Sequence, residues 1–146
     1  MKDPRGAAQH FKECLKIRET LSSKDPTNYR KQMDLMLVLP HCGQHQRAAQ
    51  LAEKLRVGKQ KDRELLLTIA RCYAQCAAAL AGDPTRQHQN EEKALAAMRD
   101  AVGQGYKDLI SLETDPDLDP VRESPEFQKL LGDIKSKEVA AAKAKP

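Results

Sequence analysis

The chain has 146 residues, which suits one domain, and it carries 25 Lys and Arg against 21 Asp and Glu, a formal net charge of +4. No apolar run approaches the roughly 18 residues needed to cross a bilayer, and the first residues lack the apolar stretch of a secretory signal. Trp is absent and aromatic residues are scarce, which favours close packing of Ala- and Leu-rich helices over strands. We therefore expect an all-α, cytoplasmic protein that does not enter a membrane.

Five of the eight prolines follow Asp and one follows Ser, and these pairs are candidate helix starts. Asp or Ser accepts hydrogen bonds from the free amides of a first turn, and proline fits the next position because its missing N–H would be unpaired there. The polar stretch 82–90 is expected to be a loop that enlarges a hairpin. With the apolar periodicity, the pairs predict, in chain order, helices near 4–23, 26–41, 45–57, 61–80 and 87–103, a short helix near 106–113, a turn near 119–122 and a last helix near 125–136.

One set of apolar positions recurs after 34 residues, so that Gln32, Leu35, Met36, Leu39 and Gly43 correspond to Leu66, Ile69, Ala70, Tyr73 and Ala77. The segments that follow share a second spacing, in which a small residue is followed by others four and seven positions later. These stripes, which we call packing seams, lie on one helix face, where small side chains let two backbones approach. A fixed period of this length is typical of stacked helix hairpins. The three packing seams are Ala7, Phe11 and Cys14; Ala48, Ala52 and Leu55; and Ala94, Met98 and Ala101.

This pattern resembles the tetratricopeptide repeat family, whose 34-residue unit is a helix–turn–helix. Asp25-Pro26 stands where the closing proline of that family would stand. The chain departs from the family in having no Trp, in placing Gln32 at a position usually held by a large apolar residue, and in spacing its seams by 41 and 46 residues. The resemblance implies a right-handed α-solenoid of helix hairpins, with a repeat core over residues 4–103 that is lengthened by extra turns and an insertion.

The proline-rich stretch after Gly103 departs from the repeat. Because the end of a solenoid exposes an apolar face that needs an atypical terminal unit, we predict a C-terminal cap of short helices over residues 104–136. The domain then spans residues 1–136, and an Ala/Lys-rich flexible tail follows over 137–146. From Ala94 to Leu131 the chain also resembles the end of tetratricopeptide regions in large bacterial serine/threonine protein kinases. That resemblance implies a piece of a larger signalling protein, although kinase motifs themselves are missing from the chain.

The first seam belongs to a second helix whose expected partner would precede it. An apolar strip that involves Phe11, Cys14, Leu15 or Ile17 is therefore predicted to be exposed. In a larger protein a preceding helix would cover this strip, and in isolation a second copy of the chain would cover it as a homodimer.

No complete catalytic or metal centre is evident in the sequence. His41, Cys42 and His45 cluster at one helix end, but a zinc site needs further ligands that converge on them. Cys72 and Cys76 lie four residues apart on a helix, where buried and reduced cysteines favour a cytosolic setting. No nucleophile with a neighbouring base is present. We expect no enzymatic activity, no cofactor and no metal.

The expected function is that of a non-catalytic protein–protein interaction scaffold. The first helices of each hairpin line the concave side in the tetratricopeptide family, so the resemblance implies an apolar peptide or helix with an acidic group near Arg71. Met33 and Leu37 replace two members of the family's carboxylate clamp, which argues against binding of chaperone tails. The implied partner groove consists of Met33, Leu37, His41, Leu67, Arg71 and Gln75.

Two other roles remain open at this point. The array can serve as a structural spacer or dimerisation module with no peptide ligand, a role favoured if the groove is filled by its own chain. Weak nucleic-acid binding is the other, and it is disfavoured because the cations are interleaved with acids and aromatic residues are scarce.

Overall fold

The computed structural model describes residues 3–145, so the ends of the predicted domain and tail at residues 1–2 and 146 lie outside the described residues. The described part is all-helical and contains no strand, which confirms the all-α class. None of its helices is both long and apolar enough to cross a bilayer. The elements are α1 (Pro4–Lys24), α2 (Tyr29–Val38), the 3₁₀ turn η1 (Pro40–Cys42), α3 (His45–Arg56), α4 (Arg63–Ala79), α5 (Pro84–Gly103), α6 (Leu109–Thr114), the 3₁₀ turn η2 (Pro116–Leu118), α7 (Asp119–Arg122) and α8 (Pro125–Lys143).

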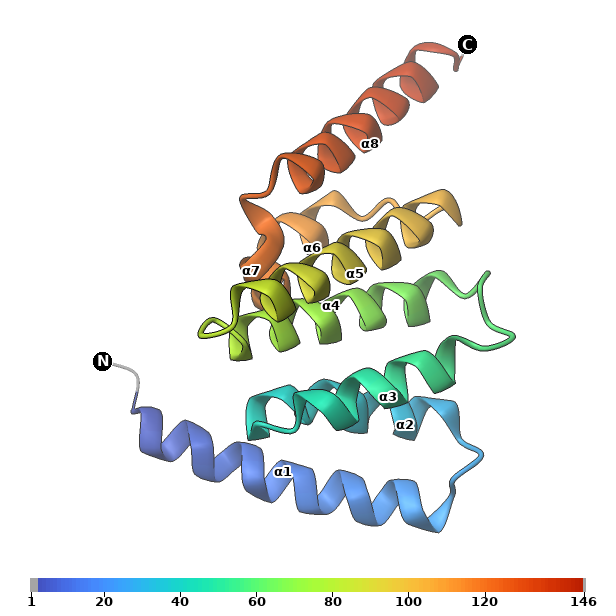
Figure 1. The fold of residues 1–146 in the computed structure, drawn as a ribbon. Helices are drawn as coiled ribbons and strands as arrows, with labels where there is room; N and C mark the ends of the chain where they lie inside the picture. Colours follow the sequence, from blue (N-terminus) through green and yellow to red (C-terminus); the bar gives the residue numbers. More distant parts are fainter. Residues whose placement is uncertain (1–2, 146) are drawn as a thin grey trace.

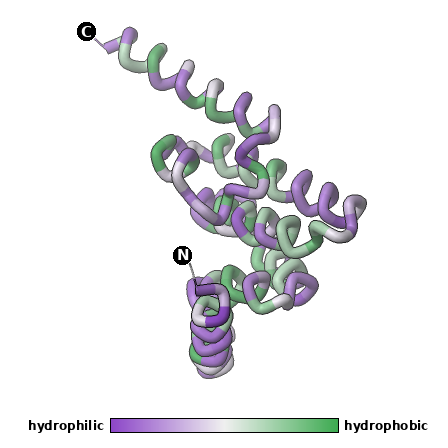
Figure 2. The backbone as a smooth tube through the Cα atoms, turned by 90° about the vertical axis from the view of Figure 1, so that its left-hand side faces the viewer, coloured by the Kyte–Doolittle hydropathy of each residue, from purple (hydrophilic) through white to green (hydrophobic). Residues whose placement is uncertain are grey.

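Helices α1 to α5 run back and forth in one row, and each packs against the next (Figure 1). The connections 25–28, 57–62 and 104–108 lie at one edge of the row, whereas 39–44, 80–83 and 115–124 lie at the other (Figure 1). After α5 the chain turns back, and η2 and α7 pack against α4. Figure 2, in which α1 is seen almost end-on, shows α8 leaving the molecule at the end opposite to α1.

Helix α4 is the centre of the core. Asp62 caps its first turn by accepting the Leu65 amide at 3.1 Å, and every residue from Leu65 to Ala70 is buried. This helix contacts α2, α3, α5, α7 and both 3₁₀ turns. A helix that packs against neighbours on most sides needs apolar residues around most of its circumference. The sequence of α4 accordingly lacks a wide polar face.

The second and third packing seams are buried as expected, with all six of their residues in the core. The first seam differs, because Ala7 is exposed and Phe11 and Cys14 are half-buried. Helix α1 packs mainly on α2 and η1, with an ion pair from Glu19 to Arg47 of α3, so this packing seam is less buried than the other two.

Three of the expected boundaries are wrong. Helix α2 begins at Tyr29, after an Asn28 cap, and ends before η1, because the Pro40 ring has no N–H to continue an α-helical ladder. Residues 84–90, expected to be a loop, form the first turns of α5, with Asp83 as the N-cap and Pro84 at the first helical position. Helix α8 continues to Lys143 rather than ending near 136, since Ala and Lys are strong helix formers.

Candidate functional site

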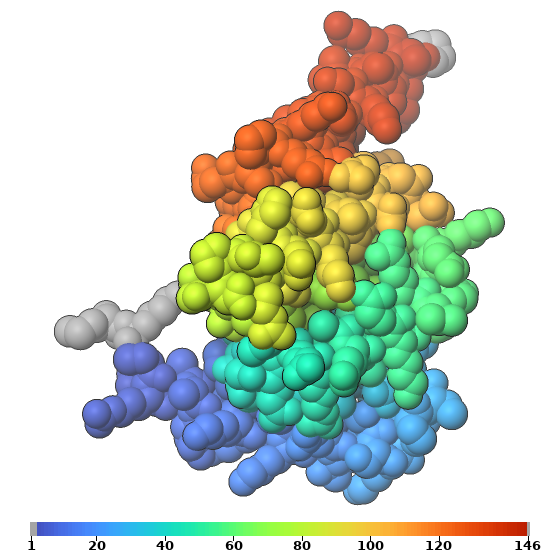
Figure 3. Space-filling view, viewed as in Figure 1, coloured from blue at the N-terminus to red at the C-terminus, as the bar shows by residue number. Residues whose placement is uncertain are grey.

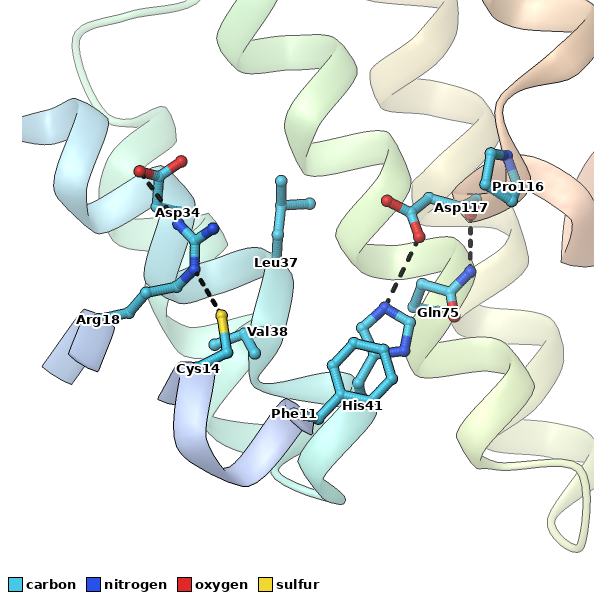
Figure 4. A pocket seen from close by; sticks show the side chains of 10 residues that line it. All are labelled: Phe11, Cys14, Arg18, Asp34, Leu37, Val38, His41, Gln75, Pro116 and Asp117. Atoms are coloured by element: carbon cyan, nitrogen blue, oxygen red, sulfur yellow. Dashed lines mark hydrogen bonds and ion pairs between the residues drawn. The ribbon is translucent and has the colours of Figure 1, made fainter. Parts of the chain in front are cut away.

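A cleft of about 520 Å³ opens between α1, α2 and η2 (Figure 4). The connection 39–44 and the segment 115–124 both contribute to its lining. Short stretches of chain that are distant in sequence supply its walls. The lining residues are Phe11, Cys14 and Arg18 from α1, Asp34, Leu37 and Val38 from α2, His41 from η1, Gln75 from α4, and Pro116 and Asp117 from η2.

The apolar part of the cleft comes from α1 and α2. Leu37 is half-buried and Val38 is buried beneath it. The Phe11 ring stacks on the His41 imidazole, with the ring centres 4.4 Å apart and the planes 4° from parallel. This stack joins α1 to η1 and leaves the Phe11 and Leu37 side chains facing the same open space (Figure 4).

The polar side chains of the cleft lie against one another in pairs. Arg18 lies between Cys14 and Asp34, donating from Nε to Sγ at 3.1 Å and forming an ion pair from Nη1 to Oδ2 at 3.0 Å. Across the cleft, His41 Nε2 lies 3.6 Å from Asp117 Oδ1. Because these polar groups already have partners, a ligand would recognise mainly the apolar surface of the cleft.

The structure brings part of the predicted groove together at this cleft. Leu37, His41 and Gln75 line it. Met33 is half-buried and packs against the core instead. Leu67 is 1% exposed and belongs to the core itself. The 34-residue periodicity assigned Leu67 to the ligand-facing side of α4. It carries no information about η2 and α7, the later segments that pack against this helix.

Arg71 already binds an acidic group that belongs to its own chain. Its Nε lies 2.5 Å from Asp115 Oδ2, and the two side chains are 25% and 12% exposed. Next to it, Gln75 Nε2 donates to the Asp117 carbonyl oxygen at 3.0 Å. The acidic ligand group expected near Arg71 is therefore supplied in cis by Asp115, the N-cap of η2.

The segment that occupies this half of the groove is held in one conformation by several hydrogen bonds. Asp115 Oδ1 accepts the Asp117 amide at 3.0 Å and caps η2. Arg122 donates to the carbonyl oxygens of Leu112, Glu113 and Asp115. These contacts fix the turn in front of α4. Sequence reasoning missed the role of Asp115 and Asp117, because no local signal links them to Arg71 and Gln75 more than 40 residues earlier.

The side chains singled out for chemistry form no metal centre. Among residues 3–145, no group of three or more His, Cys, Asp and Glu side chains is arranged to hold a metal ion. Cys72 and Cys76 are buried in α4, and a hydrogen bond to Cys76 together with burial raises the pKa of the Cys72 thiol well above its usual value. A thiol held protonated in this way is a poor nucleophile and a poor metal ligand.

The apolar strip predicted on α1 is only partly exposed. Leu15 is buried, whereas Phe11 and Cys14 are half-buried against α2 and η1. Ile17 is 61% exposed, and Leu21, one turn further along, is 46% exposed. The outward face of α1 therefore carries Ile17, one of the four predicted candidates, together with Leu21.

Comparisons of the chain with protein-family models, with curated proteins and with solved structures give no match in any of the three.

Proposed function

We propose that this protein is a non-catalytic interaction module that binds a short apolar segment of a partner protein in the cleft of Figure 4. The proposal includes a right-handed α-solenoid of tetratricopeptide-like hairpins, in which α2 and α4 are first helices and α3 and α5 are second helices. A cytoplasmic setting within a larger bacterial signalling protein belongs to the same proposal and derives from the resemblance alone.

One observation carries the proposal. The open cleft contains Leu37, His41 and Gln75, which the repeat alignment assigns to the ligand-facing side of two successive first helices. Phe11 of α1 adds an aromatic side wall. Pockets that recognise ligands combine mainly apolar walls with a few fixed polar groups, and this cleft has that composition.

The chemistry of the cleft favours an apolar ligand without a charge at the contact. Arg18 and His41 face Asp34 and Asp117 within the cleft, so an incoming carboxylate would compete with existing pairs. A leucine or phenylalanine side chain on a partner helix or extended segment would instead cover Leu37 and Phe11.

A structural role is the alternative, and a specific observation favours it. Asp115 and Asp117 occupy the half of the groove beside Arg71 and Gln75, as expected of an array that only positions other parts of a larger protein. Pairing of two copies through Ile17 and Leu21 on α1 would fit either role.

The test is selection of peptides from a random display library on the intact chain, followed by affinity measurement by fluorescence anisotropy. Selected peptides should be apolar, and Leu37→Asp should weaken them about tenfold or more, because a charge enters an apolar contact. Ile110→Asp is the matched control, since Ile110 is 75% exposed on α6 and outside the cleft. Enrichment of no peptide, or equal binding by both variants that remain folded, would favour the structural role.

A further inference from the structure

A second pocket, of about 300 Å³, lies between α1, α2 and α3 and shares no lining residue with the cleft of Figure 4. On the face shown in Figure 3, α3 (teal) lies against α1 (blue), and the Glu19–Arg47 ion pair joins these two helices. Each helix contributes side chains three or four positions apart, which share one helix face. The lining residues are Glu19, Ser22 and Ser23 from α1, Gln32 and Leu35 from α2, and Arg47, Gln50, Leu51 and Lys54 from α3.

The walls of this pocket are mainly polar. Leu35 and Leu51 are its only apolar side chains, and no aromatic ring lines it. A ligand would therefore be held by hydrogen bonds and charge rather than by burial of an apolar group.

The pocket lies in the part of the chain that carries its excess of positive charge. Residues 16–56 contain eight Lys and Arg and four Asp and Glu, so this range accounts for the whole net charge of +4. Outside it, acids and bases are equal in number. Three of the four acids in the range are engaged elsewhere: Asp25 with Lys31, Asp34 with Arg18, and Glu53 with Tyr73.

The fourth acid, Glu19, is the one carboxylate that lines the pocket, and its Oε1 lies 2.5 Å from Arg47 Nη1. Lys54 lines the pocket, and Lys16 and Lys24 line an adjoining hollow that also contains Glu19. Within residues 3–145 these three lysines form no ion pair. The pocket and its rim therefore carry more positive than negative charge.

A buried hydroxyl in the pocket has a proton to donate. Ser22 is 6% exposed, and its Oγ accepts the Gln32 side-chain amide at 2.6 Å. The Thr20 and Ser23 hydroxyls each donate to a main-chain carbonyl oxygen one turn earlier, whereas Ser22 donates to no group in the described part of the chain. A buried donor that lacks an acceptor lowers stability unless a bound group or water accepts its proton.

We propose that this pocket binds the phosphate group of a small phosphorylated molecule. A phosphate monoester carries close to two negative charges at neutral pH and three terminal oxygens that accept hydrogen bonds. Lys54 and Arg47 supply two cationic donors, and Ser22 supplies a hydroxyl. A carboxylate has a single charge and two oxygens, so it would satisfy fewer of these donors. This site is independent of the partner segment proposed for the cleft of Figure 4.

Two other sources of phosphate fit the pocket less well. Bases of a nucleic acid stack on aromatic rings, which this pocket lacks. A phosphorylated segment of a partner protein needs an extended surface, whereas a volume of about 300 Å³ is at the lower end of sites for small molecules.

The experiment titrates glycerol 1-phosphate into the full chain at constant ionic strength and follows the backbone amides by two-dimensional NMR. The amides of residues 19–23 and 47–54 should shift and saturate with a dissociation constant of about 1 mM or below. Lys54→Gln should weaken binding about tenfold, because a charge-assisted hydrogen bond is lost. Lys129→Gln is the matched control, since it removes the same charge from an exposed position on α8, and it should bind like the unmodified chain.

A second variant tests the site through a gain of affinity, which a folding defect would not produce. Glu19→Gln removes the carboxylate that would repel a phosphate and releases Arg47 from its ion pair. Binding of glycerol 1-phosphate should therefore tighten about threefold or more.

Several results would overturn this inference. Amide shifts that grow without saturation would mean that no site exists, and equal losses in Lys54→Gln and Lys129→Gln would mean that only net charge matters. Unchanged affinity in Glu19→Gln would place the phosphate elsewhere. Tighter binding of a phosphoserine peptide than of glycerol 1-phosphate would assign the pocket to a partner protein. Leu37→Asp should leave these shifts unchanged, so failure of the cleft and failure of this pocket are distinguishable.

Discussion

Replacing Ala94 by Arg is the most direct test of how α5 packs against α4, the helix at the centre of the core. Ala94 is fully buried in α5, and the contact between α4 and α5 is the most extensive between any two elements of the described chain. It belongs to the third packing seam, with Met98 and Ala101. A small side chain at this point allows the two backbones to approach closely.

The expected cost follows from the missing space and from the charge. Forcing extra volume into a packed site costs about 1–3 kcal/mol, and burying a polar or charged head without a partner adds about 1–3 kcal/mol or more. A loss of about 3–5 kcal/mol would remove a large share of the roughly 5–15 kcal/mol by which domains are stable. For a domain of this size, the melting temperature should fall by about 10 °C or more.

The assay is thermal and urea denaturation followed by circular dichroism in the far ultraviolet, which reports helix content. Ala78→Arg is the matched control, because Ala78 is exposed on α4 and the same substitution there should change stability by no more than about 0.5 kcal/mol. If both variants melted like the unmodified chain, Ala94 would not lie in a close helix contact, and the register of α5 on α4 would be wrong.

The remaining predictions concern two polar contacts. Asp115→Asn should cost about 1–3 kcal/mol in urea unfolding, because Arg71 loses its charged partner at a largely buried site, and adding Arg71→Met should recover part of that loss; no recovery would contradict the pairing. The Tyr73 hydroxyl donates to Glu53 at 2.5 Å and lowers the pKa of that carboxyl from its ordinary value of 4.5, so the stabilisation is present at neutral pH and is lost as the pH falls below this value. Since the Glu53 side chain is 60% exposed, Tyr73→Phe should cost less than about 1 kcal/mol at neutral pH and flatten the decline in acid; an equally steep decline in the Phe variant would refute this.

The sequence predicted what depends on local periodicity. Ala48, Ala52 and Leu55 repeat the spacing of Ala94, Met98 and Ala101, and both sets are buried. Small residues at these intervals indicate a close helix contact, because a packed neighbour leaves room for nothing larger. The all-α class follows from the same pattern.

The errors arise where a local signal was outweighed by another or by tertiary contacts. Residues 84–90 looked like a loop because they are polar, yet the Asp83 cap and Pro84 start a helix whose polar side chains remain largely exposed. Half of the candidate groove was misjudged for a different reason. Leu67 is buried in the core and Arg71 is bound by Asp115, and a pairing across 44 residues leaves no trace in helical spacing.

Occupation of the groove by the chain's own acids limits what any partner can do there. A tethered group acts at an effective concentration of about 1 mM. A free acidic peptide with the same intrinsic affinity for Arg71 would therefore have to exceed that concentration to displace Asp115. Leu37 and Phe11 face no such competitor, because they line an open cleft. Reversing the charge of Arg71 would set two negative groups against each other and loosen η2. A loss of binding in Arg71→Glu would therefore report damage to the C-terminal segment, whereas Leu37→Asp alters the ligand-facing surface and leaves the Asp115 contact in place.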